Sequence, residues 1–437
     1  MRMKKRRIFL GVQEIAGMME RLNNAFHDMG IESDFYCIPE YAFDFGKKDV
    51  PVLKKFRIHT KKKKYAVGER AKAWRSFLQM WDILHVFAYA FFRYDSFIYI
   101  YGNGMFFHNR YLRKIEEVEF FILKMFRKKM VMWLCGSDAR PPYCDGANYF
   151  SDIGKVYSVT REKASRIKML EKYMDVIDYS PSSHFHTKPY LIFNCIGIPV
   201  DEKERVQKKE TDGKIRILHA PSDQIGKGTA VIRKIIKEIQ EEGYQFEYIE
   251  VSGLPHSVVL EKMAMSDIVV DQVYCDTPMA GFATEAAING VPVVVGGYYA
   301  DVYKKVLPDP IAPTVYCNPE ELKEKIIYLI EHEEERNRIG EKERAYVERY
   351  CLAETVANKF LSILDNSYPK EWIMDPKVND YIWGYGQNKE TVANEITRLI
   401  DRYGTEALCL DKNSILYKKY VQLYNDTKAG NRVKEGI

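Results

Sequence analysis

Apolar and polar positions alternate along the chain in two series of short apolar runs and longer amphipathic stretches. The first series opens with an apolar run at residues 7–12, a helical apolar stripe at 18–29 and a second run at 34–38, a pattern typical of a βαβ unit. In the same half we expect strands at 97–101, 130–134, 156–159 and 176–179, and helices at 115–127 and 163–173. Alternating strands and helices predict a parallel sheet covered on both faces.

A second series begins after a polar stretch at residues 201–213, which has few apolar residues to bury and predicts a linker. Strands are expected at 215–219, 246–251, 268–271, 292–295 and 313–316, and helices at 228–242, 257–265 and 281–289. From Pro319 onward the pattern is almost wholly helical, at 322–331, 334–350, 353–364, 389–403 and 414–424. The pattern restarts, so the sequence predicts two domains of the same kind.

The predicted fold is α/β, with two Rossmann-like, doubly wound parallel-sheet domains and a helical C-terminal extension. We expect an N-terminal domain at 1–200, a second Rossmann-like domain at 213–345, and a helical segment at 346–437 that packs back on the N-terminal domain. Open parallel sheets bind ligands beyond the carboxyl ends of their strands. The functional residues are therefore expected in loops after strands, around a central cleft that the two domains face.

The composition is that of a globular protein. Of 437 residues, 46% are hydrophobic and 29% charged, which excludes a disordered chain and a small disulfide scaffold. The eight cysteines are scattered without a C-x-x-C pair, and the N-terminus lacks the long apolar run of a secretory signal, so we expect a reduced, cytoplasmic protein. Charges interrupt the most apolar window, residues 83–101, and no membrane-spanning helix is expected there.

The net charge of +5 hides two halves of opposite sign, because the chain carries +13 up to Val200 and −8 after it. A dense cationic run at 54–65 precedes an aromatic stretch that includes Trp74, Phe77 and Trp81. Cations beside amphipathic aromatic residues suit a protein resting on an anionic membrane surface, here the inner face of the plasma membrane. The alternative is a solvated loop followed by a core helix. The same charge would attract nucleic acid, which we do not expect as a partner.

The loop after the first strand of the second half, residues 219–229, reads HAPSDQIGKGT and places Lys227 where a helix begins. Helix N-termini carry partial positive charge and free N–H groups, so a lysine there suits a phosphate or diphosphate ligand. The alternative is a solvated lysine beside a turn glycine.

A second loop, which ends in GFATEAAINGVPVVV at residues 281–295, carries Gly281 and Glu285 four residues apart on one helix face. Backbone N–H groups near Gly281 are unpaired in such a helix, and Glu285 can accept hydrogen bonds from a diol. The pair can hold a ribose and its diphosphate. Alternatively, Glu285 only complements the helix dipole.

These two strings, in this order, resemble the donor-binding domain of retaining GT-B glycosyltransferases of the group 1, family 4-like type, which build bacterial surface polysaccharides. The segment GSDAR at residues 136–140 is similar to the Gly-Ser-Asp-x-Arg segment in one branch of that group. The resemblance implies transfer of a sugar from a nucleotide diphosphate sugar to a glycan or lipid-linked acceptor, without a metal or another cofactor.

The resemblance also implies roles for individual residues. It assigns Lys227 to the diphosphate and Glu285 to the ribose, and it places both with Asp138 in the catalytic set. The other positions expected at the nucleotide sugar are Gly17, Ser222, Gly253, Leu254, Gly281, Phe282 and Ala283. Ser137 and Arg140 are expected on the acceptor side.

Three positions depart from the pattern of these enzymes. Thr277, or Asp276 if the loop differs by one residue, stands where many have a second glutamate; Gln224 replaces an arginine, and Cys135 a histidine. A catalytically silent GT-B binding or scaffold subunit is therefore an alternative, and a sugar-nucleotide epimerase a weaker one. A dehydrogenase lacks its fingerprint here, since residues 102–104 form a lone G-x-G.

Overall fold

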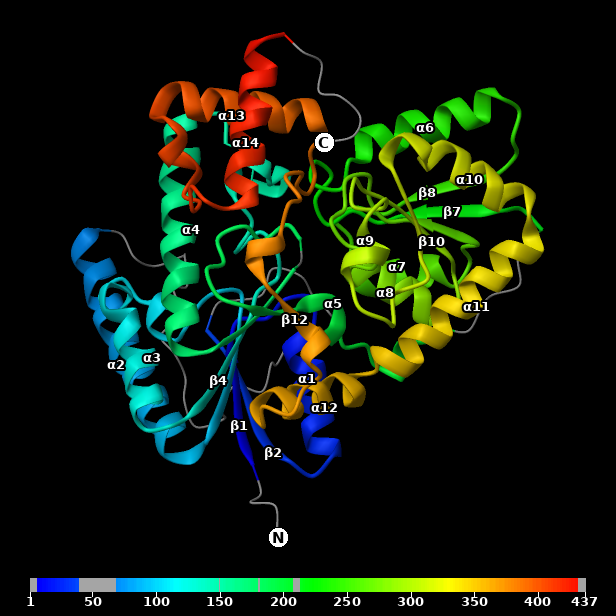
Figure 1. Cartoon of the computed structure of the whole chain (residues 1–437). Helices are drawn as coiled ribbons and strands as arrows, with labels where there is room; N and C mark the ends of the chain where they lie inside the picture. The colour runs from blue at the N-terminus through cyan, green and yellow to red at the C-terminus, as the bar shows by residue number, and fades with distance from the viewer. Residues whose placement is uncertain (1–5, 39–67, 149, 180, 207–212, 431–437) are drawn as a thin grey trace. The chain divides into compact units, whose positions relative to one another are not determined.

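The computed structural model describes residues 6–38, 68–148, 150–179, 181–206 and 213–430, so the predicted cationic run at 54–65 lies outside the described residues. The chain divides into two compact units, each built from several stretches (Figure 1). Unit 1 comprises Met1–Cys135, Met169–Ile177 and Ala353–Tyr368; unit 2 comprises Gly136–Lys168, Asp178–Leu352 and Pro369–Ile437. The domain limits expected from the sequence stay a prediction.

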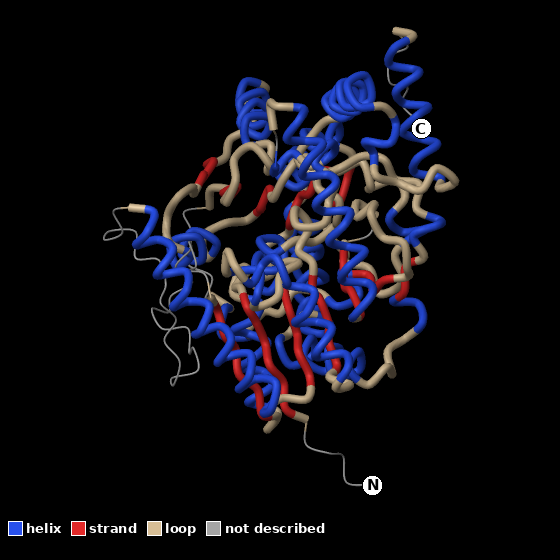
Figure 2. The backbone as a smooth tube through the Cα atoms, turned by 90° about the vertical axis from the view of Figure 1, so that its left-hand side faces the viewer, coloured by secondary structure: helices blue, strands red, loops and turns tan. Residues whose placement is uncertain are grey.

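Unit 1 is built on parallel strands in the order β5-β4-β3-β1-β2. They are β1 (Arg7–Val12), β2 (Glu32–Cys37), β3 (Ser96–Ile100), β4 (Lys129–Trp133) and β5 (Asp175–Asp178). Figure 2 shows these strands side by side, with helices on either side. Ile8, Phe9 and Leu10 are all fully buried, as expected of a parallel strand covered on both faces. The helices of this unit are α1 (Met18–Asp28), α2 (Glu69–Arg93), α3 (Glu116–Met125) and α12 (Ala353–Leu364).

Unit 2 contains a second parallel sheet, in the order β11-β10-β9-β7-β8. Its strands are β7 (Arg216–His219), β8 (Glu247–Glu250), β9 (Ile268–Val270), β10 (Val293–Gly296) and β11 (Val315–Cys317). The helices that alternate with or follow them are α6 (Thr229–Glu241), α7 (His256–Met263), α8 (Gly281–Ile288), α9 (Tyr303–Val306), α10 (Leu322–Glu331) and α11 (Glu333–Tyr350). The strand order reverses between β7 and β9, and this reversal is the usual ligand position in such sheets.

The rest of unit 2 consists of helices and one short strand pair. It includes most of α4 (Ile153–Tyr173), α5 (Phe193–Ile196), α13 (Lys389–Tyr403) and α14 (Ile415–Lys428), while β6 (Tyr190–Ile192) pairs antiparallel with β12 (Ile373–Met374). In the part of the chain that the structure describes, no helix is both long and apolar enough to cross a bilayer.

The predicted fold class is confirmed: both halves form parallel α/β sheets. The strand expected at 156–159 is wrong, because these residues lie in α4. Val156, Thr160, Ala164 and Ile167 are all buried, at spacings of four, four and three residues. That is the period of one helix face, and it extends beyond the short apolar run that suggested a strand.

Helices α8 and α11 approach each other closely at Gly340. A Cβ atom added at Gly340 would lie 2.1 Å from the carbonyl oxygen of Gly290. Alanine favours a helix over glycine by about 1 kcal/mol. We nevertheless expect Gly340→Ala to lower the free energy of unfolding by about 1–3 kcal/mol, because the added methyl forces the helices apart. Chemical denaturation measures this change, and the exposed Glu341→Ala on the same helix should change it by less than about 0.5 kcal/mol.

Candidate functional site

Lys227 and Asp271 meet at the point where the strand order of unit 2 reverses. Lys227 lies in the loop after β7, and Asp271 directly follows β9. The Lys227 Nζ atom donates a hydrogen bond of 2.7 Å to Oδ1 of Asp271, and both residues are buried. Burial lowers the pKa of Lys227, but the Asp271 carboxylate more than offsets this, so the pKa lies above its usual value. The lysine is therefore a charged, internally paired cation.

The loop that carries Lys227 is fixed on both sides. Gly228, the residue before α6, has a left-handed φ of 70°, and a Cβ there would lie 2.7 Å from the side chain of Val273. The ring of His219 lies 2.8 Å from the carbonyl oxygen of Val270 and 2.9 Å from the hydroxyl of Thr229. Burial lowers the pKa of His219. The lysine side chain is thus presented from a rigid turn.

Arg140 forms a second buried ion pair, with Asp276 of the loop after β9. Its Nε and Nη2 atoms lie 2.5 and 2.9 Å from the two carboxylate oxygens, and Ser182 hydrogen-bonds to the same carboxylate. Burial lowers the pKa of Arg140, while Asp276 and Asp145 raise it above its usual value. The two-point contact fixes the orientation of the guanidinium plane as well as its position.

Tyr385 lies against both cationic residues. Its ring centroid is 4.5 Å from the guanidinium carbon of Arg140, and its ring would be 3.3 Å from a Cβ added at Gly226, the neighbour of Lys227. The N–H of Gly146 donates to the carbonyl oxygen of Tyr385 at 2.8 Å, which fixes the backbone. Burial raises the pKa of Tyr385, so the hydroxyl stays neutral. A C-terminal segment therefore completes a site formed by two loops of the sheet.

Glu285 has a different partner. Its carboxylate lies 3.0 Å from Nε2 of His256, the first residue of α7, and its exposed fraction is 8%. The carbonyl oxygen of Glu285 accepts a hydrogen bond from Asn289 at 2.8 Å. Gly281 begins α8 as expected, followed by Phe282, half-buried, and Ala283, fully buried. The first turn of α8 and the Glu285 carboxylate are thus fixed by their own neighbours.

The remaining predicted residues of unit 2 lie in loops. Ser222, Gly253 and Leu254 are exposed, and Ser137 and Asp138 are half-buried. Burial lowers the pKa of Lys163, and Asp145 and Asp138 act against that effect. Arg140, which was expected on the acceptor side, is bound by Asp276, and Asp276 lies in the same loop as Asp271. The roles of all these residues stay predictions.

Gly17, expected near the donor phosphates, lies in unit 1 and precedes α1 with a left-handed φ of 74°. The backbone N–H groups there are already occupied. The carboxylate of Glu14 accepts hydrogen bonds from the N–H groups of Ile15, Met19 and Glu20, at 2.8, 3.3 and 3.0 Å. An anion at the start of α1 would compete with this buried carboxylate.

The positions that depart from the resemblance have defined partners. Thr277 is buried and accepts a hydrogen bond of 2.6 Å from the side chain of Asn194. Gln224 is exposed and donates to the hydroxyl of Ser252 at 3.2 Å. Of the two residues considered in place of a second glutamate, Asp276 is the one that contacts a cation.

Tyr385 and Ser182 belong to the site but were not predicted from the sequence. Tyr385 lies in the segment Trp383-Gly384-Tyr385-Gly386, where glycines flank one aromatic residue. A Cβ added at Gly384 would lie 1.5 Å from the carbonyl oxygen of Cys144, so the glycine permits a close backbone approach. The two glycines beside Tyr385 could therefore have indicated a tightly packed segment from the sequence alone. Nothing in the sequence around Ser182 marks its contact with Asp276.

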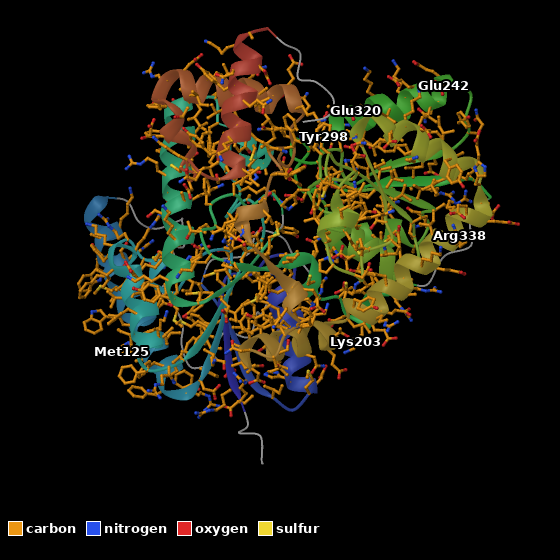
Figure 3. All side chains as sticks on the ribbon, in the orientation of Figure 1. Met125, Lys203, Glu242, Tyr298, Glu320 and Arg338 are labelled. Atoms are coloured by element: carbon orange, nitrogen blue, oxygen red, sulfur yellow. The ribbon has the colours of Figure 1, made fainter. Side chains whose placement is uncertain are left out.

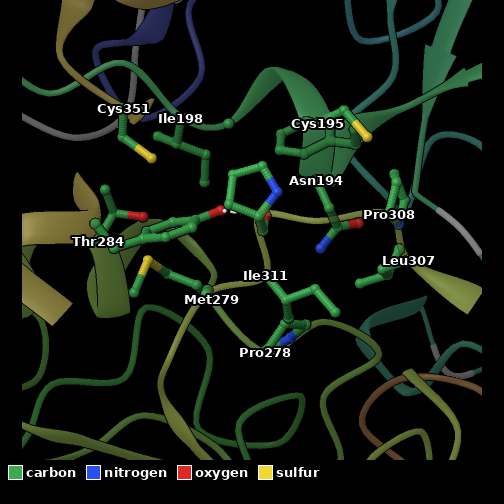
Figure 4. A pocket seen from close by; sticks show the side chains of 15 residues that line it. Asn194, Cys195, Ile198, Pro278, Met279, Thr284, Leu307, Pro308, Ile311 and Cys351 are labelled. Carbon is green, nitrogen blue, oxygen red and sulfur yellow. Dashed lines mark hydrogen bonds between the residues drawn. The ribbon is translucent and has the colours of Figure 1, made fainter. Parts of the chain in front are cut away.

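A pocket in unit 2 lies beside the start of α8. Figure 4 shows Thr284 and Asn194 on opposite sides of it, with the apolar side chains of Ile198, Met279 and Ile311 between them. None of the predicted site residues is among those that line it. Its lining is mostly apolar. Within the described ranges, no group of three or more His, Cys, Asp or Glu side chains is arranged to hold a metal ion.

The chain matches no protein-family model and no curated protein. Solved structures resemble it at low identity, and three of them serve as examples. Sucrose-phosphate synthase from Thermosynechococcus elongatus is 13% identical with a TM-score of 0.48, over 83% of this chain and 99% of that one. HepE from Anabaena, in complex with UDP-glucose, is 11% identical with a TM-score of 0.47, over 83% and 99%. The glycosyltransferase SnogD from Streptomyces nogalater is 12% identical with a TM-score of 0.41, over 82% and 100%.

The buried carboxyl group of Glu14 predicts a pH dependence of stability. Burial raises its pKa from 4.5 to about 7 against the lowering effect of its backbone hydrogen bonds. The folded chain therefore binds more protons than the unfolded chain between these pH values, and the free energy of unfolding falls as pH rises through them. Because a glutamine cannot ionise, Glu14→Gln should make this fall less steep.

Denaturant titrations at about pH 5 and about pH 7.5 measure the effect. Glu334→Gln, at an exposed position of α11, is the control and should leave the slope unchanged. An unchanged slope in Glu14→Gln would contradict the prediction.

Proposed function

We propose that the chain is a GT-B glycosyltransferase that moves a sugar from a nucleotide diphosphate sugar to a glycan or lipid-linked acceptor. In this proposal the enzyme is a metal-independent, hexosyl-type transferase that retains the configuration of the sugar and acts in surface polysaccharide or glycoconjugate synthesis. The observation that carries it is the pair of buried cations, Lys227 and Arg140, which both lie near Tyr385 beside the reversal point of the second sheet.

Departure of a nucleoside diphosphate builds negative charge on its phosphate oxygens. Fixed cations at that position stabilise the charge without having to reorganise during the reaction. Lys227 is held in a rigid turn, and Arg140 is oriented by Asp276 and Ser182. We infer that the diphosphate is bound beside these two residues, and that the ribose is bound by Glu285 with His256 as its neighbour.

The donor has to compete with the partners that Lys227 already has. Its single hydrogen bond to Asp271 can be exchanged for one to a phosphate oxygen, since the flexible side chain carries three donors. The two-point contact of Arg140 with Asp276 is harder to exchange. In this proposal Lys227 moves to the diphosphate while Arg140 stays on Asp276 and contributes its charge from there.

One observation favours the second candidate function, a catalytically silent binding subunit. Each of the two cations is already matched by a buried carboxylate, so the paired site has no net charge. Such a site could bind a neutral or weakly charged ligand and hold it without chemistry. The two candidates differ in whether a bound donor turns over.

Nucleotide sugars and the free nucleoside diphosphates provide the test. A glycosyltransferase should be stabilised against heat by at least one of them, by about 2.7 kcal/mol at one hundred times the dissociation constant. It should also hydrolyse that donor slowly when no acceptor is present. Stabilisation without any hydrolysis or transfer favours the silent subunit, and the absence of stabilisation by every nucleotide tested contradicts both candidates.

If Lys227 exchanges its hydrogen bond to Asp271 for one to a phosphate oxygen, then removal of the Asp271 charge should affect nucleotide binding in a predictable way. Asp271→Asn keeps the shape of the partner but removes the competing charge, so nucleoside diphosphate should bind as tightly as in the wild type, or more tightly. The double variant Lys227→Met with Asp271→Asn leaves no buried unpaired charge, and its affinity should fall about 10- to 150-fold. Isothermal titration measures both constants.

The matched control is Lys305→Ala, which removes an exposed lysine of α9 and should leave nucleotide affinity unchanged. Glu285→Gln should weaken binding of a nucleotide that has a ribose diol more than one that lacks it. Equal affinity of the wild type and the double variant would contradict the assignment of Lys227.

A further inference from the structure

Helix α2 of unit 1 exposes aromatic side chains where a surface helix ordinarily exposes polar ones. Trp74, Phe77, Trp81 and Phe92 follow one face of the helix, and between 39% and 79% of each is exposed. The rings of Trp74 and Phe77 stack at 5.6 Å, and Trp81 follows at 6.2 Å from Phe77. The exposed face of this helix is therefore a continuous aromatic ladder along its first half.

The inward face of α2 buries apolar side chains, among them Ile83 and Val86, and two polar ones. Ser76 and Gln79 are buried, and the side chain of Asn109 donates to the carbonyl oxygen of Ser76 at 2.7 Å and to Oε1 of Gln79 at 3.3 Å. Since these groups are hydrogen-bonded inside the unit, turning the helix to bury its aromatic residues would break them.

Helix α3 also combines a buried polar side chain with exposed apolar ones. Glu119 is fully buried and accepts hydrogen bonds from the N–H groups of Met105 and Phe106, at 3.0 and 2.8 Å. The exposed side of α3 carries Phe121 and Met125, and Figure 3 shows the Met125 side chain pointing away from the sheet. The two helices thus present apolar side chains that the described residues of unit 1 leave exposed.

The two helices form one surface. The ring centroids of Phe91 in α2 and Phe126, which directly follows α3, are 4.9 Å apart. Figure 1 shows the two helices as neighbours. We use "the apolar face" for the exposed side chains of Trp74, Phe77, Trp81, Phe92, Val118, Phe121, Met125 and Phe126. Exposed apolar surface of this extent marks an interaction site.

The segments that carry the apolar face also carry cations. The guanidinium carbon of Arg113 lies 4.2 Å from the ring centroid of Phe107, and the ammonium of Lys128 lies 5.1 Å from that of Phe91. Further exposed cations on these helices or in the segments next to α3 are Lys72, Arg93, Arg110, Lys114, Lys124 and Arg127, of which Arg93 is paired with Glu32 at 2.6 Å. The exposed acid of α3, Glu117, is paired with Lys172 at 2.8 Å. The rim is therefore positive.

We propose that the apolar face is a docking surface for an anionic lipid bilayer. Tryptophan and phenylalanine at the depth of the headgroups, with lysine and arginine beside them, are the side chains that bind a membrane interface. A second copy of the chain fits less well, because its own positive rim would oppose this one. This proposal does not rest on the proposed glycosyltransferase activity.

Sedimentation of the full chain with lipid vesicles, without nucleotide, tests the proposal. The wild type should bind vesicles that contain phosphatidylglycerol more tightly than vesicles of phosphatidylcholine alone. The variant with Trp74→Gln, Phe77→Gln and Trp81→Gln should bind at least about tenfold more weakly, because it loses the inserted rings. A matched control replaces exposed apolar residues of unit 2, with Val302→Gln, Val306→Gln and Tyr328→Gln, and should bind as the wild type does.

Tryptophan fluorescence identifies the residues that enter the lipid. Brominated lipid should quench the emission of the wild type, and most of the quenching should be lost in Trp74→Phe with Trp81→Phe. Of the other three tryptophans, Trp133 is fully buried, and Trp372 and Trp383 belong to unit 2. Equal vesicle binding by the glutamine variant and the wild type would overturn the proposal, as would failure of the wild type to bind anionic vesicles. A dimer that the glutamine variant abolishes would make a second copy the occupant and would also overturn it.

Thermal unfolding and nucleotide titration of the glutamine variant separate this result from the proposed function. Both should match the wild type, because the three residues are exposed and belong to unit 1. If the wild type binds no nucleotide, the proposed glycosyltransferase function is contradicted, but the result with vesicles still stands.

Discussion

The buried ion pair between Arg140 and Asp276 is the constraint on which the arrangement of unit 2 depends. Transfer of either charge out of water costs several kcal/mol, and the cost is offset only when the partner is present and the geometry is good. Here the contact has two points, and Ser182 and the ring of Tyr385 complete the surroundings of the guanidinium. Loss of either partner would leave a buried charge, at a cost of about 3–5 kcal/mol. The chain segment at 136–146 is therefore tied to the second sheet.

The same pairing decides how the site can respond to a ligand. Lys227 and Asp271 neutralise each other, as do Arg140 and Asp276, so a diphosphate would enter a site without excess positive charge. Of the two cations, only the lysine is held by one flexible contact, and only it can be redirected at low cost. The arginine stays in place, and its positive charge attracts the diphosphate electrostatically. A neutral resting site of this kind also avoids leaving a buried cation unpaired when the ligand is absent.

The sequence predicts the sheets well because their signal is local. The apolar runs of β1 and β7 and the glycine and lysine before α6 lie within a few residues of the features they predict, and the helices at 322–331 and 353–364 begin and end where expected. The partners of Lys227 and Arg140 could not be predicted in this way. Asp271 lies 44 residues from Lys227, and Asp276 lies 136 residues from Arg140. These pairings depend on the tertiary fold, and no local sequence pattern indicates them. Tyr385 is still further from the loops it contacts, although its flanking glycines show that a close approach is needed.

The aromatic stretch shows a different limit of sequence patterns. Periodicity identifies an apolar stripe on a helix but does not say which side of the helix faces the interior. In α3 that choice is made by Glu119, whose carboxylate is the acceptor for two loop N–H groups and for the hydroxyl of Tyr99. These donors would be buried without partners if the helix turned, so the glutamate faces inward and Phe121 and Met125 face outward. The apolar positions of α3 are therefore divided, since Phe120 and Leu123 are buried beside Glu119 while Phe121 and Met125 stay exposed, and periodicity alone does not separate the two sets.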